Sequence, residues 1–303
     1  MSFNPLTVVT IGTFDGVHLG HQTIIRDVIE RAKAIHGRSV IVTFNPHPRE
    51  VIGKGPLDYL NTIEERLEYF EQLGVDETLV VNFTYEFSQT SARSFYEEYL
   101  VKQIGVHDVV IGHDHMFGRN REGSIDILRE LGTEMGFGVY VVPGVSVQDK
   151  VVSSSLIRKC LASGNVESAA EYSGRPYSIT GIVVEGDKRG RTIGFPTANV
   201  SYDVTKKLTP ESGVYAVHVK IENKMYFGML NIGVRPTFNS NGKKMVEVHL
   251  LDFQGDVYGS TIKVSFLKRL RSEQKFNSVQ ELITQLQRDR LDTQQFVSTI
   301  IHS

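Results

Sequence analysis

The sequence predicts two domains: an α/β domain with a parallel sheet, followed by a β-rich domain that C-terminal helices close. Three observations support this prediction. The chain has 303 residues, which is enough for two domains of ordinary size. In its first half, strand-like and helix-like segments alternate, a pattern typical of a parallel sheet with helices on both faces. In its second half, short strand-like segments and tight turns follow one another, which favours a sandwich or a barrel.

The first half contains the alternating segments. Strands are expected over residues 6–12, 39–44, 77–83, 108–112 and 138–142, and helices over residues 22–35, 63–73, 92–104, 125–135 and 154–162. Thr62 with Glu65 forms a capping-box pattern, and Ser91 is placed to cap the helix that follows it. In such sheets ligands bind beyond the carboxyl ends of the strands, so a site is expected in the segments that follow them.

The second half begins after residues 172–176. Strands are expected over residues 177–184, 214–221, 224–232, 244–251 and 261–267, and two helices over residues 278–288 and 293–301. The predicted domains are therefore residues 1–172 and residues 177–303.

Composition and charge disfavour several classes of protein. Hydrophobic residues make up 40% of the chain and charged residues 22%, so a folded core is expected. The net charge of −2 and the sequence pI of about 6.6 argue against a nucleic-acid partner, which would need a basic face. The single cysteine, Cys160, excludes an internal disulfide and a site of several thiolates. No run approaches the ~18 apolar residues of a membrane span, and residues 1–10 lack a secretory pattern, so a cytoplasmic protein without a membrane partner is expected.

The central motif is GTFDGVHLGH, residues 12–21, between the first strand and the first helix. Its glycines, which let the backbone approach a ligand, are Gly12, Gly16 and Gly20. A helix that begins near Gly20 offers unpaired N–H groups and a positive dipole end, and His18 and His21 add two donors, so the motif suits a nucleotide phosphate. A metal-binding histidine pair or a structural turn with solvated imidazoles also fits the motif.

The second strand is followed by FNPHP, residues 44–48. Two prolines stiffen this segment and present Asn45 and His47, either to a ligand or merely on a rigid surface turn.

The fourth strand is followed by residues 112–123. His113 and His115 resemble metal ligands, but alternate residues of an extended chain point to opposite sides. Asp114 is preferred as a polar ligand or magnesium group, with a nearby arginine on phosphate. The candidate arginines are Arg119 and Arg121.

The fifth strand is followed by a serine run that begins a helix at residues 153–155. A serine such as Ser154 can simply cap this helix, but a capped helix start is itself an anion site. Hydroxyls of this run and Arg158 are therefore candidates for a triphosphate.

Two adjoining segments of the second half suit phosphate and magnesium. Residues 186–194, GDKRGRTIG, form either a phosphate cover or a solvated turn. Residues 195–199, FPTAN, place the Thr197 hydroxyl and the Asn199 amide two residues apart, and magnesium bound to nucleotide phosphates prefers a few oxygens of this kind.

An acid follows within a predicted strand. Glu247 and His249 lie on one face of this strand. Glu247 is a general-base candidate if that face lines a cavity, and a solvated residue if it faces water. The chain contains no Gly-x-x-x-x-Gly-Lys-Ser/Thr run, so it is not a P-loop kinase.

Taken together, these motifs resemble those of the bacterial bifunctional riboflavin kinase/FAD synthetases. The first half matches the nucleotidyltransferase signatures at residues 12–21, 44–48, 112–118 and 153–158. The second half matches the riboflavin kinase signatures at residues 190–199, 231–237, 247–249 and 266–276. The resemblance spans nearly the whole chain and implies a Rossmann-like nucleotidyltransferase domain followed by a riboflavin kinase β-barrel.

The resemblance implies two reactions. The C-terminal domain phosphorylates riboflavin with ATP, and the N-terminal domain adenylylates FMN with a second ATP to give FAD and pyrophosphate. Glu247 would be the kinase base, with Thr197 and Asn199 on Mg²⁺ and phosphate, while His18 and His21 would hold the triphosphate in the transferase. The nucleotide and phosphate sites would comprise Gly12, Phe14, Gly16, Gly20, Ser154, Arg158, Gly190 and Thr197, and the flavin sites Asn45, Asp114 and Arg271.

The implied partners are small molecules, namely ATP, riboflavin and FMN, bound by a monomer or a weak homo-oligomer. One departure concerns Asn165, which stands where many members have Asp, so the role of this position is open. Two rival hypotheses are an adenylyltransferase with a degenerate kinase half and a flavin-binding regulator that touches RNA. Intact Thr197, Asn199 and Glu247 argue against the first, and the pI argues against the second.

Overall fold

The computed structural model describes residues 2–53, 55, 57–119, 122–186, 189–203, 206–234 and 244–301. The chain divides into two compact units, Met1–Ser154 and Ser155–Ser303, which we call the α/β unit and the barrel unit. Both architectures agree with the predicted fold class.

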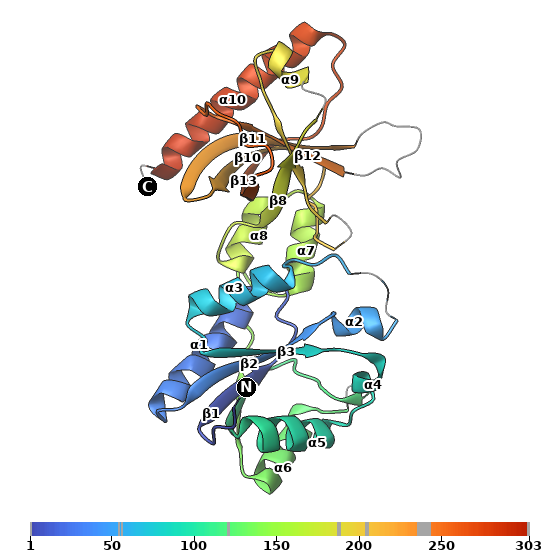
Figure 1. The fold of residues 1–303 in the computed structure, drawn as a ribbon, viewed down its shortest axis with the longest axis vertical. Coiled ribbons are helices and arrows are strands. Elements are labelled where there is room, and N and C mark those ends of the chain that lie inside the picture. The colour runs from blue at the N-terminus through green and yellow to red at the C-terminus, as the bar shows by residue number, and fades with distance from the viewer. Residues whose placement is uncertain are drawn as a thin grey trace. The chain divides into compact units, whose positions relative to one another are not determined.

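The α/β unit contains a five-stranded parallel sheet with strand order β3-β2-β1-β4-β5 (Figure 1). Its strands are β1 (Thr7–Ile11), β2 (Arg38–Asn45), β3 (Glu77–Asn82), β4 (Val106–Gly112) and β5 (Gly138–Val142). The central strands are apolar because both of their faces are buried, and Val8 and Val9 of β1 lie in separate core clusters.

Helices cover both faces of this sheet. On one face, α1 and α3 pack through Ile25 and Phe70 against Ile41; on the other, Phe95 and Leu128 pack against the alternate strand residues. The helices are α1 (Leu19–Ala34), α2 (Pro48–Val51), α3 (Ile63–Leu73), α4 (Tyr85–Ser88), α5 (Ala92–Phe95), η1 (Tyr96–Ile104) and α6 (Ile125–Met135), and a small hairpin follows with β6 (Ser146–Val147) and β7 (Lys150–Val151).

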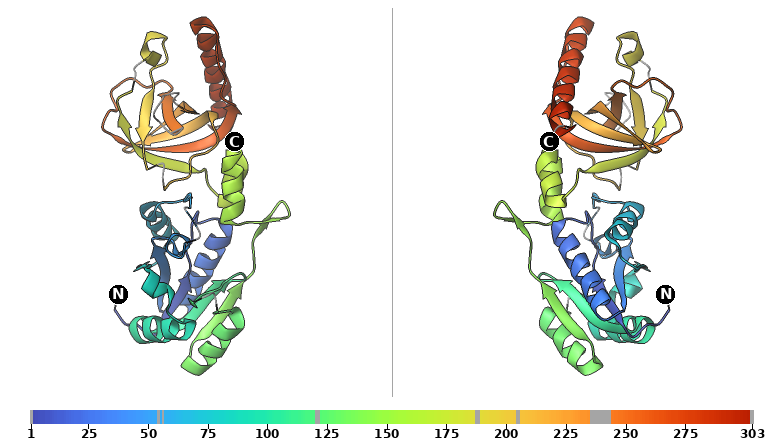
Figure 2. Two further views of the ribbon diagram at one scale, coloured as in Figure 1. Left: turned by 90° about the vertical axis from the view of Figure 1, so that its right-hand side faces the viewer. Right: turned by 90° about the vertical axis from the view of Figure 1, so that its left-hand side faces the viewer.

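The barrel unit contains a closed antiparallel barrel with strand order β10-β11-β12-β9-β8-β13. Its elements are α7 (Ser154–Ala162), α8 (Val166–Ser173), β8 (Ser178–Val184), α9 (Arg189–Thr192), β9 (Ala198–Ser201), β10 (Gly213–Ile221), β11 (Lys224–Val234), β12 (Lys244–Leu250), β13 (Thr261–Arg271) and α10 (Val279–Ile301). Helix α10 packs along the outside of the barrel against β10, β11 and β13, as Figure 2 shows. Helix α8 packs on β13.

The structure differs from the predicted elements in three ways. The two C-terminal helices are wrong: α10 is one continuous helix, in which Asp289, Thr293 and Val297 form a buried stripe at four-residue spacing. The helix predicted over residues 92–104 becomes a π-helix from Tyr96 onward. Several mostly short elements were not predicted, namely the helices α2, α4, α8 and α9 and the strands β6, β7 and β9.

Candidate active sites

The turn after β1 is tightly coiled. Phe14, Gly16 and Val17 all have positive φ, at 49°, 88° and 38°. A side chain at Gly16 would lie 2.7 Å from Leu60 Cδ1, so this position requires glycine for both conformation and space.

Asp15 fixes this turn from beneath. Its side chain is 2% exposed, and its carboxylate accepts hydrogen bonds from the backbone N–H groups of Leu60 and Asn61 at 3.0–3.2 Å. Ser154 Oγ donates to the Asp15 carbonyl oxygen at 2.8 Å. The turn is therefore bound to two later segments of the α/β unit.

Helix α1 begins at Leu19, three residues before the start of the helix predicted over residues 22–35 and one residue before Gly20. His18 is its N-cap, and His18 Nδ1 accepts the His21 N–H at 3.3 Å. The two imidazoles stack with centroids 3.6 Å apart, and Phe14 contacts the His21 ring edge-on. The first turn of α1 contains no acidic residue, so its positive dipole end is left uncompensated.

A pocket of about 990 Å³ lies at the carboxyl ends of β1, β2 and β4; we call it the α/β pocket. Four predicted site residues line it, namely Gly12, Phe14, His21 and Asp114. Part of its wall is apolar and aromatic, formed by Phe44, Phe83, Tyr85, Phe87, Met116 and Phe117. This wall was not predicted from the sequence, although Phe44 is the last but one residue of β2 and Phe83 directly follows β3.

Six other predicted residues are not among those that line this pocket: Gly16, His18, Gly20, Asn45, Ser154 and Arg158. His18 is 6% exposed and caps α1, and Ser154 holds the turn. Asn45 is exposed at the end of β2, before a cis peptide bond to Pro46. Arg158 is half-buried on α7 of the barrel unit.

His115, which was considered from the sequence only as a possible metal ligand, lines the α/β pocket. Burial lowers the pKa of His115 to about 4, so the imidazole is neutral at pH 7. Its Nε2 lies 3.3 Å from the hydroxyl of Tyr96, which is fully buried, and its ring stacks on Phe117. The described residues contain no group of three or more His, Cys, Asp or Glu placed to hold a metal, so the structure adds nothing to the metal alternative.

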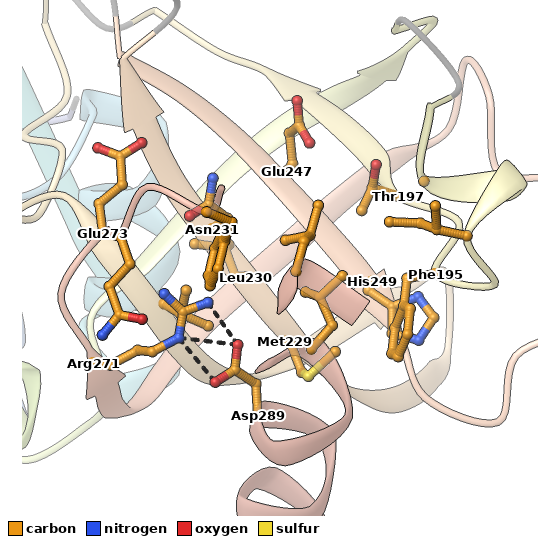
Figure 3. A pocket seen from close by; sticks show the side chains of 17 residues that line it. Phe195, Thr197, Met229, Leu230, Asn231, Glu247, His249, Arg271, Glu273 and Asp289 are labelled. Atoms are coloured by element: carbon orange, nitrogen blue, oxygen red, sulfur yellow. Dashed lines mark hydrogen bonds and ion pairs between the residues drawn. The ribbon is translucent and has the colours of Figure 1, made fainter. Parts of the chain in front are cut away.

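The second pocket, of about 340 Å³, lies on the outer face of the barrel beside α10 (Figure 3). Glu247 lines this barrel pocket, while Val246 and Val248 point into the barrel core. Glu247 is in register with Asn231 of β11 on one side and Asn199 of β9 on the other. The three strands therefore carry a row of a carboxylate and two amides.

The FPTAN segment is held beside this row. His249 Nδ1 bonds to the Pro196 carbonyl at 2.7 Å, and because a carbonyl only accepts, Nδ1 carries the proton. Burial lowers the pKa of His249, which favours its neutral form, and its ring contacts Phe195 edge-on. Thr197 lines the pocket, whereas Asn199 is not among the lining residues, although it is in register with Glu247, which is.

Gly190 also lines the barrel pocket, where the backbone of the 190–195 segment closes on itself. The Phe195 N–H donates to the Gly190 carbonyl at 2.8 Å, and a side chain at Gly190 would lie 2.2 Å from the Phe195 oxygen. This close approach explains a glycine at this position.

Arg271 lines the pocket, but its guanidinium is already paired. Its Nε and Nη2 bind the carboxylate of Asp289 on α10 at 2.7–3.1 Å, and Asp289 is 1% exposed (Figure 3). The pair attaches α10 to the end of β13, so that Leu282 and Leu286 of α10 also line the pocket. The contribution of α10 could not be predicted, because nothing in the local sequence around Asp289 indicates that it pairs with Arg271.

Some predicted residues lie outside the described residues. They are Arg121 of the 112–123 segment, Asp187 and Lys188 of the 186–194 segment, and Arg235, Pro236 and Thr237 of the 231–237 motif.

Comparison with known proteins assigns each half to a family. The sequence model of the FAD synthetase family matches residues 2–156, and that of the riboflavin kinase family matches residues 173–297. The bifunctional riboflavin kinase/FMN adenylyltransferase of Bacillus subtilis is 39% identical over 298 residues, covering 97% of this chain and 93% of the relative. The chain belongs to the bifunctional riboflavin kinase/FMN adenylyltransferase family. This confirms the predicted family and the prediction of an enzyme with a kinase half and an adenylyltransferase half.

Other relatives agree with this assignment. The Escherichia coli K12 enzyme of the same name is 38% identical over 292 residues, which is 95% of this chain and 92% of that protein. A crystal structure described as a macrolide-efflux protein from Streptococcus pneumoniae matches with a TM-score of 0.88 and 33% identity, over 97% of this chain and 94% of that one. Among the described helices of the present chain, none is long and apolar enough to cross a membrane.

Proposed function

We propose that the barrel unit transfers the γ-phosphoryl group of ATP to riboflavin, and that the α/β unit transfers the adenylyl group of a second ATP to FMN. The observation that carries this proposal is that each half has its own pocket and that each pocket gathers motif residues of one reaction. Gly190, Thr197, Glu247 and Arg271 line the barrel pocket, and Gly12, Phe14, His21 and Asp114 line the α/β pocket.

In the kinase reaction, the primary hydroxyl of riboflavin attacks the γ-phosphorus of ATP, and ADP leaves. Glu247 accepts the hydroxyl proton, and its place on a pocket wall supports this role over that of a solvated strand residue. The side-chain amides of Asn231 and Asn199, on the strands to either side of Glu247, orient the reacting groups next to this carboxylate. The apolar side chains of Met229, Leu282 and Leu286 suit the flavin ring, and Arg271 borders it with its charge balanced by Asp289.

The residues around Thr197 suit Mg²⁺. The Thr197 hydroxyl and the Asn199 amide oxygen, two residues apart, would supply few protein oxygens, as expected for magnesium bound chiefly through nucleotide phosphates. Bound there, the ion would neutralise charge on the β- and γ-phosphates.

In the transferase reaction, an FMN phosphate oxygen attacks the α-phosphorus of ATP directly, and pyrophosphate leaves. No enzyme nucleophile is needed, so positioning and charge stabilisation supply the catalysis. The uncompensated start of α1 and His21 hold the triphosphate, at the end of the turn that contains Gly12, Gly16 and Gly20 and whose conformation requires Gly16.

The remaining predicted residues have supporting roles in this proposal. His18 shapes the helix start as its cap, and Ser154 holds the turn through Asp15. Asp114 and Asn45 are assigned to the flavin side, next to the aromatic wall, and Arg158 to the triphosphate.

One assay tests both activities. The protein is incubated with riboflavin and Mg-ATP, and riboflavin, FMN and FAD are separated by chromatography. Both FMN and FAD are expected, and a chelator in excess of Mg²⁺ should stop FMN formation. FAD from supplied FMN without FMN from riboflavin would support the degenerate-kinase alternative, and neither product would support the flavin-binding regulator.

We further propose that the two activities are separable near residues 172–177. Within the barrel unit, however, the α7–α8 segment is attached to the barrel, because the Glu211 N–H donates to the Leu161 carbonyl and Arg269 Nη1 donates to the Ser163 carbonyl. Fragments 155–303 and 172–303 should therefore both make FMN and no FAD, with the longer fragment unfolding at the higher temperature. A folded fragment that makes no FMN would show that the halves need each other.

The proposed setting is the cytoplasm. The proposed enzyme is a monomer or a weak homo-oligomer that binds ATP and flavins, without a nucleic-acid or membrane partner.

A further inference from the structure

The most deeply buried charged side chain of the described α/β unit has no place in the proposed mechanism. Arg66 lies on α3, is 1% exposed, and does not line the α/β pocket. Burying a guanidinium is costly, and its Nε atom has no hydrogen-bond partner among the described residues. A packed apolar residue could fill this space at lower cost, so the contacts that Arg66 does make need an explanation.

These contacts reach two pocket loops at once. Arg66 Nη1 donates to Thr43 Oγ1 at 3.2 Å and to the Phe44 carbonyl at 3.4 Å. Thr43 Oγ1 in turn donates to the Thr13 carbonyl at 3.3 Å. A single guanidinium is thus bound directly to the end of β2 and, through one hydroxyl, to the turn after β1.

Burial lowers the pKa of the Arg66 guanidinium, and the nearby carboxylates of Asp15 and Glu64 oppose this shift electrostatically. Tyr59, which is neutral at pH 7 because burial raises its pKa to about 12, lies near Arg66 but does not balance its charge. The Tyr59 hydroxyl accepts the His47 N–H at 3.2 Å and donates to Glu50, so it holds the segment after β2. Two residues near the Arg66 guanidinium therefore hold the two segments: Asp15 holds the turn after β1, and Tyr59 holds the segment after β2.

Both segments supply pocket residues. Gly12, Thr13 and Phe14 come from the first, and Phe44 and His47 from the second. The proposed reaction brings the ATP α-phosphorus at the first segment to the FMN phosphate near the second. Its rate therefore depends on the distance between the two segments.

We propose that Arg66 is a positioning residue for adenylyl transfer, which sets the spacing of the turn after β1 and the segment after β2 without touching substrate. This inference rests on the proposed transferase function of the α/β unit. It treats Thr43 as the relay between the guanidinium and the first turn.

The test compares Arg66→Met and Thr43→Val, which remove the guanidinium and the relay hydroxyl with little change in volume. Thr43→Ser, which keeps the hydroxyl, is the conservative variant. Arg93→Met is the matched control, because Arg93 forms a bidentate pair with Glu134 on the exposed surface of the same unit. Steady-state FMN adenylylation and riboflavin phosphorylation are measured for each folded variant, together with thermal unfolding.

In Arg66→Met, kcat for adenylylation should fall about 10²-fold, the loss expected when reacting groups are misplaced by about 1 Å. Thr43→Val should lose about tenfold, Thr43→Ser should retain activity, and KM for ATP and FMN should change by less than about threefold, because the contact acts in the transition state. Riboflavin phosphorylation and the Arg93→Met variant should match wild type. The double variant should be no slower than Arg66→Met alone, since both substitutions break one relay.

A folded Thr43→Val variant with wild-type kcat and a lowered melting temperature would overturn the inference and leave Arg66 as a structural residue. Additive losses in the double variant would overturn the relay. Wild-type protein that makes no FAD from FMN would instead refute the proposed function, so the two failures are distinguishable.

Discussion

The two pockets are built in different ways. In the α/β pocket, the proposed phosphate-binding features come from one stretch of ten residues, where a turn and a helix start bring backbone N–H groups close to the His21 imidazole. In the barrel pocket, Asn199, Asn231 and Glu247 come from three strands, and α10 supplies an apolar wall. In the proposed mechanism, the α/β pocket binds substrate largely through backbone groups, whereas the barrel pocket depends on one carboxylate, that of Glu247, for proton transfer. Single side-chain changes should therefore affect the barrel pocket more.

Glu247→Gln should have the largest effect. It removes the proposed base while keeping its shape, and general-base assistance is typically worth about 10²–10⁴-fold, so FMN formation should fall by that factor. Adenylylation of supplied FMN should stay near wild type, and both half-reactions are measured on the folded variant.

Asp252→Asn is the matched control for Glu247→Gln, because the Asp252 side chain is 78% exposed just beyond the end of the same strand. It should leave both reactions unchanged. Full kinase turnover in Glu247→Gln would refute the base assignment, and parallel loss of both activities would indicate a damaged fold.

His21→Ala should have a smaller effect, confined to the other reaction. Loss of one preorganised donor costs about 3–4 kcal/mol, or 10²–10³ in rate, and the α1 backbone remains to hold phosphate. The assay is FAD formation from FMN, with riboflavin phosphorylation as the internal reference. His107→Ala is the control because His107 lies half-exposed on β4, near the opposite end from the pocket. Unchanged adenylylation in His21→Ala would make His21 a structural residue.

The same contrast explains what the sequence could predict. The α/β sheet and α1 depend on local periodicity and on a turn with one glycine of positive φ, Gly16, so their places were predicted to within a few residues. The row formed by Asn199, Asn231 and Glu247 depends on strand register, which an individual segment does not reveal.

Helix α10 shows that a tertiary contact can overrule a prediction made from the local sequence. The sequence predicts one helix that ends at residue 288 and another that begins at residue 293, so Asp289 falls between them. In the structure Asp289 is buried because Arg271 pairs with it, so the helix continues. Arg66 is the converse case, since its place on α3 predicts an exposed charge and only the fold reveals the buried contacts.

The stability of the α/β unit should also depend on pH through His115, which lines the α/β pocket. The pKa of His115 is about 4 in the folded protein and about 6.5 when unfolded, so the unfolded chain binds more protons between these values. The neutral His115 imidazole therefore makes its full contribution to the free energy of unfolding above pH 6.5, and this contribution is lost as the pH falls toward 4. Because the imidazole borders the pocket and is partly reached by water, we expect a loss of about 1–3 kcal/mol.

The measurement is urea unfolding of wild type and His115→Gln at pH 7, 5.5 and 4.5, followed by hydrogen exchange in peptides of the α/β unit. Other groups also titrate in this range, so the difference between the two proteins isolates His115. The pH dependence should be weaker in the variant, and equal slopes would contradict a buried neutral imidazole at this position.

The smallest effect is expected at Asn165, where the family resemblance predicts Asp. Asn165 is the N-cap of α8, and its side-chain oxygen accepts the Ser168 N–H at 2.9 Å. Asn and Asp cap helices equally well, and a carboxylate also suits the positive helix start, so Asn165→Asp should change stability by less than about 1 kcal/mol and leave both reactions intact.

Asn165→Ala should lose about 1 kcal/mol of stability, or roughly 2–4 °C in melting temperature, as should Ser124→Ala at the start of α6 in the other unit. Equal losses of stability in Asn165→Ala and Ser124→Ala would show that Asn165 acts as an ordinary helix N-cap, as Ser124 does. If Asn165→Asp instead changed adenylylation several-fold at an unchanged melting temperature, the carboxylate of the relatives would have a role in the reaction that this chain performs without it.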